Sequence, residues 1–380
     1  MKAINKNIVV ILLIISVLAS VLSACGGSQN TNDGTMTTPT TPTTPIVDTT
    51  IPDNIDKQPL SITCISGTPA CYTYDGKTLT FTRVSAESVY AISGTLEGNI
   101  VIDTGDNYKF FLELHGFTLL TREGTPIVAY SGSEIEIKAK NGFKNYIYDD
   151  RDAIDSEYAI CSDVDLEISG KGDLEIISPN NGGIYTKDDL QVKNLNLRIV
   201  CKGNALRGND GIELLDSNTV LISSNSDCIK TTNSHINTST GNQKGTVYIS
   251  GGTHFIYAAC DGIDSAYDVV IENSATCSTY VNIFTNKYSE YSNDTVATSA
   301  MGVKSANKIL IKSGSVSIQS YDYGICAKND GGILGNGNSP KCDVTISGGT
   351  VNIKSHNKGI QADGNLNTAA GTVNVEEFCE

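Results

Sequence analysis

The block VYISGGT at residues 247–253 returns almost unchanged as VTISGGT at residues 344–350, and a weaker copy, ILIKSGS, covers residues 309–315. Each copy begins with apolar residues at alternate positions, as in a short β-strand. A glycine that permits a sharp corner follows, and then a second alternating strand. This recurrence indicates a repeating β architecture.

A second pattern gives the length of the repeat. An aliphatic residue that follows a small residue is succeeded by another aliphatic residue six positions later, as in Ile160 with Leu166. The same pairs are Ile184 with Leu190, Leu206 with Ile212, Ile263 with Val269, Val303 with Ile309, and Ile360 with Leu366. Ile229 and Ile325 open the same unit, but insertions delay their partners to Val247 and Val344. The repeat is therefore about 22 to 24 residues long.

Three short β segments per repeat, with Gly and Asn at the corners and no helical pattern, predict an all-β fold, a right-handed single-stranded parallel β-helix. A leucine-rich repeat would show leucines at fixed positions, and a β-sandwich would lack this period. Earlier, less regular coils are expected around residues 100–137, where they also cap one end. The inserted loops at 234–245, 280–299 and 329–341 fall at similar places in their coils, so we expect them to gather on one side.

The N-terminus has the features of a secretory signal over residues 1–24. Lys2 and Lys6 precede an apolar run at 8–22, which is too short for a retained membrane span. The sequence LSACG at 22–26 resembles the lipobox of bacterial lipoproteins, in which the cysteine receives a diacylglycerol. We therefore expect a cell-surface protein held to the membrane by lipid on Cys25 alone. Ordinary secretion with a free cysteine is the alternative.

Residues 25–59 are rich in Thr and Pro and poor in large apolar side chains, so they are predicted to form a disordered tether. Residues 60–380 show no further linker and are predicted to form one domain. Of the eleven cysteines, ten remain besides Cys25. Cys64 and Cys71 are close enough in sequence for a local disulfide, whereas the others suit buried thiols equally well.

The chain is acidic, with 42 Asp and Glu against 27 Lys and Arg, and it has no Lys/Arg-rich cluster. This composition argues against a nucleic-acid partner. It also disfavours simple attraction to an acidic polymer such as pectate, unless calcium ions bridge the two.

The register of the repeat brings several charged residues together. Asp227 and Asp261 fall at equivalent positions of consecutive coils, and Asp264 falls between Lys230 and Lys304. A calcium ion would suit this cluster, with oxygen ligands from Asp227, Asp261 and Asp264 and from Asn209 or Asp210 of the preceding coil. The alternative is a metal-free surface ladder in which the two lysines neutralise Asp264.

From about residue 88 to 375 the chain resembles the carbohydrate-binding domain-containing β-helix lipoproteins of cellulolytic clostridia, which contain calcium and are related in structure to family 9 pectate lyases. The matching blocks are AISGTL at 91–96, YTKDDL at 185–190, GNALRGND at 203–210, SDCIK at 226–230 and CDGID at 260–264. The resemblance implies a surface protein that binds cellulose or acidic pectin (polygalacturonate), with calcium at the aspartate cluster. Cys228 and Cys260 replace glycines of the family pattern, which leaves the backbone there less free to bend around a metal.

Three functions are open. A pectate lyase would need a cationic base, and Lys304 or Lys230 could serve. Flanking carboxylates keep a lysine charged, so we expect a binding protein with no catalytic residue. Sugar contacts would come from these lysines and from a platform of tyrosines, since the chain has no tryptophan: Tyr280, Tyr288, Tyr291, Tyr321 and Tyr323. These tyrosines could instead simply cover a loop. The third possibility is a structural adhesin whose inserted loops make the contacts.

Overall fold

The computed structural model describes residues 48–153, 157–286, 299–329 and 331–378, and every regular element in these ranges is a β-strand. This part of the chain contains no helix long and apolar enough to cross a membrane. The strands form a large 19-stranded and a small 12-stranded sheet. Their pairings are parallel except for two antiparallel pairs near the N-terminus. The prediction of an all-β chain built on parallel strands is confirmed.

The large sheet contains β1 (Ser61–Ser66), β4 (Ser88–Glu97), β6 (Lys109–Thr121), β8 (Glu134–Ala139), β9 (Lys144–Asp149), β11 (Leu166–Gly170), β12 (Asp173–Ser178), β14 (Asp189–Lys193), β15 (Asn196–Cys201), β17 (Gly211–Ser223), β19 (Thr246–Ala258), β21 (Asp268–Glu272), β22 (Thr279–Thr285), β24 (Lys308–Ile311), β25 (Ser315–Ser320), β27 (Asp343–Ile346), β28 (Thr350–Ser355), β30 (Leu366–Asn367) and β31 (Thr372–Glu377). The small sheet contains β2 (Tyr72–Tyr74), β3 (Thr78–Phe81), β5 (Asn99–Asp103), β7 (Ile127–Ser131), β10 (Tyr158–Ser162), β13 (Gly182–Thr186), β16 (Leu206–Gly208), β18 (Ile229–Thr231), β20 (Ile263–Ser265), β23 (Val303–Ser305), β26 (Ile325–Ala327) and β29 (Ile360–Ala362).

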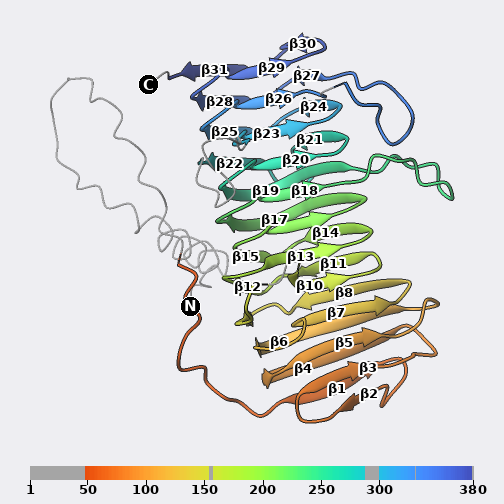
Figure 1. The fold of residues 1–380 in the computed structure, drawn as a ribbon. Coiled ribbons are helices and arrows are strands. Elements are labelled where there is room, and N and C mark those ends of the chain that lie inside the picture. The colour runs from red at the N-terminus through yellow and green to blue at the C-terminus, as the bar shows by residue number, and fades with distance from the viewer. Residues whose placement is uncertain (1–47, 154–156, 287–298, 330, 379–380) are drawn as a thin grey trace, which may run out of the picture. The chain divides into compact units, whose positions relative to one another are not determined.

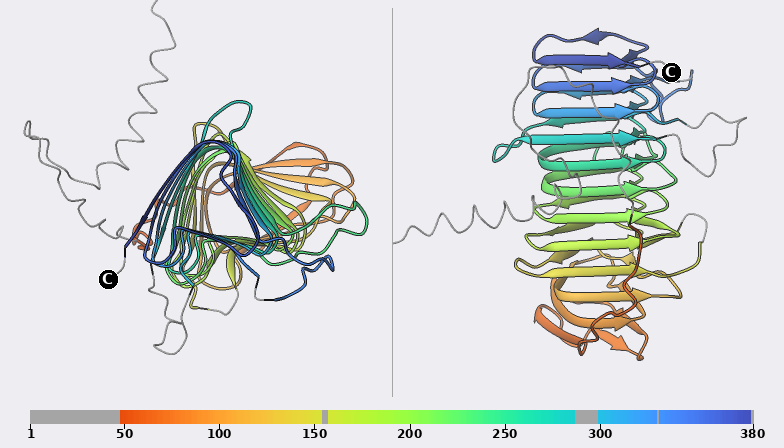
Figure 2. Two further views of the ribbon diagram at one scale, coloured as in Figure 1. Left: turned by 90° about the horizontal axis from the view of Figure 1, so that it is seen from above. Right: turned by 90° about the vertical axis from the view of Figure 1, so that its left-hand side faces the viewer.

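The chain visits the two sheets in a fixed order, so that each circuit forms one coil of a stack. In one coil, β13 lies in the small sheet, and β14 and β15 lie in the large sheet. In each coil we call the large-sheet strand that follows the small sheet the first limb, and the strand after it the second limb. β13 then pairs in parallel with β16 of the next coil, while β14 and β15 both pair with β17. The long strands β4, β6, β17 and β19 run through both limbs. Figure 1 shows the coils rising from β1 to β31, and seen from above in Figure 2 most of them overlie one another.

The inward row of the small sheet follows the register predicted from the repeat. Ile160 pairs with Ile184, which in turn pairs with Leu206. The row continues through Ile229, Ile263, Val303, Ile325 and Ile360. These side chains join the inward aliphatic residues of both limbs in one apolar core that extends through the stack. The insertions lengthen individual coils without shifting this row.

The two limbs meet at a corner that requires left-handed backbone. Asn194, Asp216 and Gly251 have φ of 57°, 45° and 79° in three consecutive coils. Gly252 has φ of 97°, and a Cβ there would lie 1.9 Å from the Ser217 carbonyl oxygen. Only glycine fits so close an approach. The predicted glycine corner is therefore present.

The inserted loops do not all share one side. Those after β18 and β26 leave the same corner and contact each other: the Gly335 amide donates to Ser234 Oγ at 2.7 Å, and Asn336 Nδ2 donates to Gln243 Oε1 at 2.7 Å. The third insertion begins after β22, and its residues 287–298 lie outside the described residues. It therefore leaves from a different corner, which corrects the prediction for this loop.

The first coils are closed by an aromatic cluster, with Phe81 and Phe110 rings 4.9 Å apart and Tyr90 packed beside both. Cys64 and Cys71 are free thiols in this region. The signal, Cys25 and most of the tether lie outside the described residues. The end of the tether, residues 48–59, contains no strand, yet Ile51 and Ile55 pack on Leu120, Tyr148 and Ile177 outside the second limb. Part of the predicted tether therefore packs on the folded domain.

Candidate functional site

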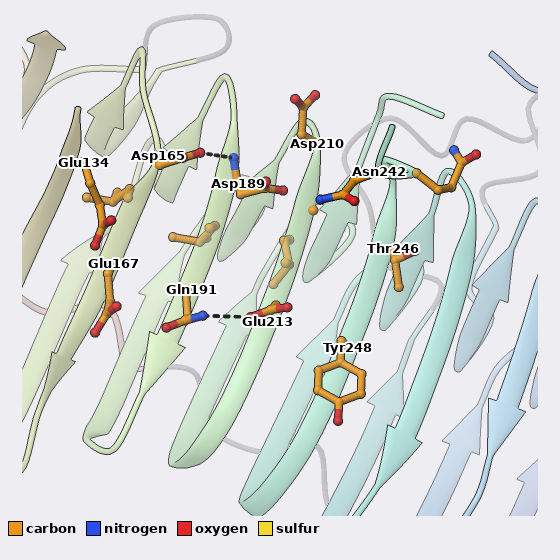
Figure 3. A pocket seen from close by; sticks show the side chains of 15 residues that line it. Glu134, Asp165, Glu167, Asp189, Gln191, Asp210, Glu213, Asn242, Thr246 and Tyr248 are labelled. Carbon is orange, nitrogen blue, oxygen red and sulfur yellow. Dashed lines mark hydrogen bonds between the residues drawn. The ribbon is translucent and has the colours of Figure 1, made fainter. Parts of the chain in front are cut away.

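An open groove of about 700 Å³ lies on the outer face of the first limb (Figure 3). Its lining comes from five consecutive coils, those of β8, β11, β14, β17 and β19, and from Asn242 and Gln243 of the loop before β19. The groove thus crosses the strands instead of following one of them. It offers a path along which an extended ligand would meet one set of side chains per coil.

The outward row in the groove consists of Glu167, Gln191, Glu213 and Tyr248 at paired positions of successive strands. Alternation along each strand sends these side chains out while their neighbours enter the core. Gln191 Nε2 donates a hydrogen bond to Glu213 Oε2 at 2.7 Å. Because coils are about 4.8 Å apart, the row presents polar groups at a regular spacing.

A second set of carboxylates lines the rim where the first limb begins. Asp165 Oδ1 accepts a hydrogen bond from the Asp189 amide at 3.2 Å (Figure 3). Carboxylate oxygens of Asp165, Asp188 and Asp189 all lie within 4.8 Å of one another. Asp210, one coil later, forms an ion pair with Lys244. None of the first three carboxylates makes an ion pair with a described residue.

The rim is therefore acidic, and Lys244, which is paired with Asp210, offsets only part of its charge. Burial raises the pKa of Asp188 and of Asp189 to about 6, and the neighbouring carboxylates add to this effect. Burial also raises the pKa of Asp165, although the hydrogen bond from the Asp189 amide opposes it. Burial acts in the same direction at Asp210, but the hydrogen bonds with Lys244, Asp188 and Asn233 together outweigh it and lower the pKa of that group.

The predicted aspartate cluster lies on the outer face of the small sheet, in the register expected. Asp264 pairs with Lys230 on one side and Lys304 on the other. Lys230 Nζ lies 2.6 Å from Asp227 Oδ2 and 2.8 Å from Asp264 Oδ2. Lys304 Nζ lies 3.3 Å from Asp261 Oδ2 and 3.5 Å from Asp264 Oδ1.

The remaining oxygens of this cluster also have donors. Asp227 Oδ1 accepts from the Asp261 amide at 3.0 Å. Asp261 Oδ1 accepts from Ser299 Oγ at 2.5 Å and from the Met301 amide at 2.9 Å. All six carboxylate oxygens are thus engaged, and a calcium ion would have to displace two ammonium groups. Carboxylate oxygens of the three aspartates nevertheless lie within 4.8 Å of one another, so calcium at this cluster stays a prediction, in competition with the two lysines.

The charges of this ladder are strongly coupled. Burial raises the pKa of Asp261 to about 6, and repulsion from Asp227 adds to it. Burial would lower the pKa of Lys230 and Lys304, but the attraction of the aspartates outweighs it and raises both above their usual value. Neither lysine is suited to act as a base near neutral pH.

Two further predicted ligands lie elsewhere. Asn209 and Asp210 follow β16, whereas Asp227 precedes β18, so the width of the small sheet separates them. Asn209 contacts Tyr185 and Thr232, and Asp210 faces the groove. The interpretation of both as partners of Asp227 is corrected, because residues at opposite ends of a strand cannot share one ion.

The predicted tyrosine platform is also divided. Tyr280 lies on the outer face of β22, half-exposed, near the start of that strand. Tyr321 follows the end of β25 and stacks on His356, with ring centroids 5.0 Å apart, and Tyr323 lies beyond it. The length of a strand, about 20 Å for six residues, therefore separates Tyr280 from the other two. Tyr288 and Tyr291 lie outside the described residues.

The groove and its rows of polar side chains form a surface suited to an extended polar ligand. Residues 75–340 match the model of the carbohydrate-binding domain-containing protein family. The chain belongs to this family. A carbohydrate-binding domain-containing protein of Acetivibrio thermocellus is 27% identical over 125 residues, which cover 31% of this chain and 44% of that protein. The chain thus spans less than half the length of this relative.

Among solved structures, a polysaccharide lyase-like protein from C. thermocellum, determined as a gadolinium derivative, is similar to this carbohydrate-binding domain protein at a TM-score of 0.40 and 18% identity. The match covers 80% of this chain and 94% of that one. Similarity at this level does not establish a common activity.

The groove was not predicted from the sequence, although the sequence contains a signal for its acidic rim. The residue just before the second aliphatic position of each repeat is Asp165 in one coil and Asp189 in the next. The same register that placed Asp227 beside Asp261 would have placed these two together. One coil later the equivalent position is Gly211, and the neighbouring Asp210 supplies the carboxylate instead.

Proposed function

We propose that this protein is a lipoprotein, anchored through Cys25, that binds plant cell-wall polysaccharide at the cell surface. Its coils are those of a right-handed single-stranded parallel β-helix, which the parallel registers at one-coil spacing support. The groove of the first limb is the binding site. The observation that carries this assignment is the run of polar side chains from five consecutive coils along one groove.

The groove favours an acidic polysaccharide, polygalacturonate, bound through calcium. Asp165, Asp188 and Asp189 supply closely spaced oxygen donors that make no ion pair with a described lysine, which is the donor chemistry that calcium prefers. Calcium there would relieve the repulsion among these carboxylates and offer positive charge to a uronate carboxylate. Gln191, Asn242 and Tyr248 are placed to bond sugar hydroxyl groups.

Binding is favoured over pectate lyase activity. The lysines that a β-elimination would use, Lys230 and Lys304, are held as charged partners of three aspartates. They also lie on the small sheet, whereas the groove lies on the first limb. We therefore expect retention of pectate without release of unsaturated uronate products.

Affinity electrophoresis of the full chain in gels containing polygalacturonate tests the proposal. Wild-type protein should be retarded with calcium and released by chelation, and no product absorbance should develop. Asp165→Asn combined with Asp189→Asn should weaken retention by on the order of tenfold or more, because two calcium ligands lose their charge. Asp53→Asn combined with Asp106→Asn, two exposed sites away from the groove, is the control of equal charge change. Retention that survives both chelation and the double substitution would refute the calcium-dependent groove.

A further inference from the structure

One wall of the groove is a hairpin, residues 234–244, which leaves the stack of coils after β18. Its two halves are joined by an isolated bridge between Ile236 and Gln243 and by the Asn237 amide, which donates to the Asn242 carbonyl at 2.8 Å. A lone two-stranded hairpin is at most marginally stable in water. Asn242 and Gln243 nevertheless line the groove. We therefore expect contacts from other parts of the chain to fix the position of this wall.

The two ends of the hairpin are joined to the rim of the groove. Asn233 Nδ2 donates to Asp210 Oδ1 at 2.6 Å, and Lys244 forms an ion pair with the same carboxylate. These contacts fix the ends of the hairpin, but they do not set the tilt of the residues between them.

The loop between β26 and β27 supplies the missing support from three coils farther along the stack, about 14 Å away. The Gly335 amide donates to Ser234 Oγ, and Asn336 Nδ2 donates to Gln243 Oε1, both at 2.7 Å. These two bonds reach opposite halves of the hairpin. The Asn336 side chain also hydrogen-bonds the phenol of Tyr267, which follows β20 in one of the intervening coils.

Residues 334–338 form a closed turn that orients these donors. Leu334 is buried, its amide donates to the Asn338 carbonyl at 2.9 Å, and its carbonyl accepts from the Gly337 amide at 2.8 Å. The Asn338 amide donates to Asn336 Oδ1 at 2.9 Å, which leaves the Nδ2 atom of Asn336 to face the hairpin. Because the turn is stabilised by its own bonds, it can serve as a rigid support.

Gly335 brings the loop against the backbone of the hairpin. A Cβ at this position would lie 2.9 Å from both the Ser234 carbonyl carbon and the His235 amide nitrogen. Gly335 has no left-handed φ, so the lack of a side chain serves the close contact and not the backbone conformation. Neither Gly335 nor Asn336 lines the groove.

From these contacts we infer that the loop of residues 331–338 positions the wall of the groove, so that Gly335 and Asn336 determine ligand affinity without touching the ligand. The inference rests on the proposed binding function of the groove. Asn242, which faces the ligand, is positioned through Gln243, its neighbour in the chain. Holding this wall in place before the ligand arrives reduces the ordering entropy that binding must offset.

Affinity electrophoresis of the full chain in polygalacturonate gels with calcium measures the effect. Gly335→Ala and Asn336→Ala should each weaken retention by about fivefold, because hydrogen bonds from the wall to a sugar are then misplaced. Two variants of the same loop are controls and should leave retention unchanged. Gly332→Ala adds a Cβ whose nearest neighbour is the Asn329 side chain, at 3.1 Å, and Asn338→Ala removes an exposed amide.

A double substitution tests whether the loop acts through the wall. Asn242→Ala should itself weaken retention, and adding Gly335→Ala should then weaken it by less than about twofold more, because the contact that the loop positions is already lost. Hydrogen exchange of the free protein gives a readout that does not depend on binding. Amides of residues 234–244 should exchange on the order of tenfold faster in Gly335→Ala, whereas amides of β14 should be unaffected.

The inference and the proposed function fail in different ways. If the wild type is retained and both single variants of the loop are retained equally well, the inference is overturned and the groove function stands. Losses that add fully in the double variant, or hairpin exchange that Gly335→Ala leaves unchanged, overturn it as well, because the loop then does not act by holding the wall. Wild-type protein that is not retained refutes the proposed function and, with it, any role of the loop in binding.

Discussion

Asp264 shows how a single residue is constrained by its neighbours in the adjacent coils. Its two oxygens face Lys230 and Lys304, and all three side chains are more than half buried. Lys230→Met should lower the free energy of unfolding by about 2 kcal/mol, because it leaves Asp227 and Asp264 partly buried without their shared cation. Lys187→Met removes a comparable but exposed pair with Asp163 and should change it by less than about 1 kcal/mol. If urea unfolding shows that Lys230→Met and Lys187→Met lower the free energy of unfolding equally, the ladder is no more stabilising than an exposed ion pair.

Asp189 gives a pH-dependent prediction with a definite sign. Its pKa is raised to about 6 in the folded protein, so between about pH 4 and 6 the folded state holds a proton that the unfolded state has lost. Its contribution to stability is therefore present at low pH and is lost as the pH rises through this window. Without calcium, Asp189→Asn should have a higher Tm than wild type at pH 7 and an equal Tm near pH 4. Calorimetry at the two pH values measures the difference, and a variant less stable at pH 7 would contradict it.

At the scale of the element, the corner between the limbs uses a residue with left-handed backbone, which is a glycine in the coil of β19. Gly252→Ala should destabilise the protein by at least about 2 kcal/mol, because it adds a Cβ against the Ser217 carbonyl as well as a strained backbone. Gly241 also has positive φ, 75°, but a Cβ there meets no atom within 4 Å. Gly241→Ala should therefore lose only about 1 kcal/mol. If Gly252→Ala and Gly241→Ala lose similar free energies of unfolding in urea, backbone strain alone, and not the contact with the Ser217 carbonyl, explains the cost at the corner.

The elements also show which parts of the fold the sequence determines. The row through Ile160 was predictable because insertions occur only at corners and leave the strand register unchanged. The ladder of Asp227, Asp264 and Lys304 followed from that register. The groove could not be predicted from the register, because its depth depends on how the loop that contains Asn242 folds against the first limb. Asn209 was assigned to the wrong cluster because the repeat fixes the coil of a residue and not the end of the strand at which it lies.

At the scale of the whole molecule, the stack of coils is stabilised by a chain segment along its side as well as by its apolar core. Residues 48–59 pass across the second limb, where Thr95 Oγ1 donates to the Asp56 carbonyl at 2.8 Å and Ile55 and Ile51 pack on successive coils. Farther along, hydrogen bonds from Thr50 lower the pKa of Asp48, and the positive charge of Arg198 on β15 adds a smaller effect in the same direction. In a stack where each coil contacts mainly its neighbours, such a segment connects coils that are otherwise coupled only in sequence.

Ile51→Ala combined with Ile55→Ala should therefore lower the free energy of unfolding by about 2 kcal/mol, because both half-buried side chains leave the apolar row of Leu120, Tyr148 and Ile177. Hydrogen exchange should accelerate in β6, β9 and β12, the strands under the segment, and remain unchanged in β25 and β28. Ile65→Ala, an exposed isoleucine on β1, is the matched control and should change stability by less than about 0.5 kcal/mol. If exchange rises uniformly along the stack, the segment contributes to global stability without holding particular coils. If neither quantity changes, residues 48–59 belong functionally to the tether.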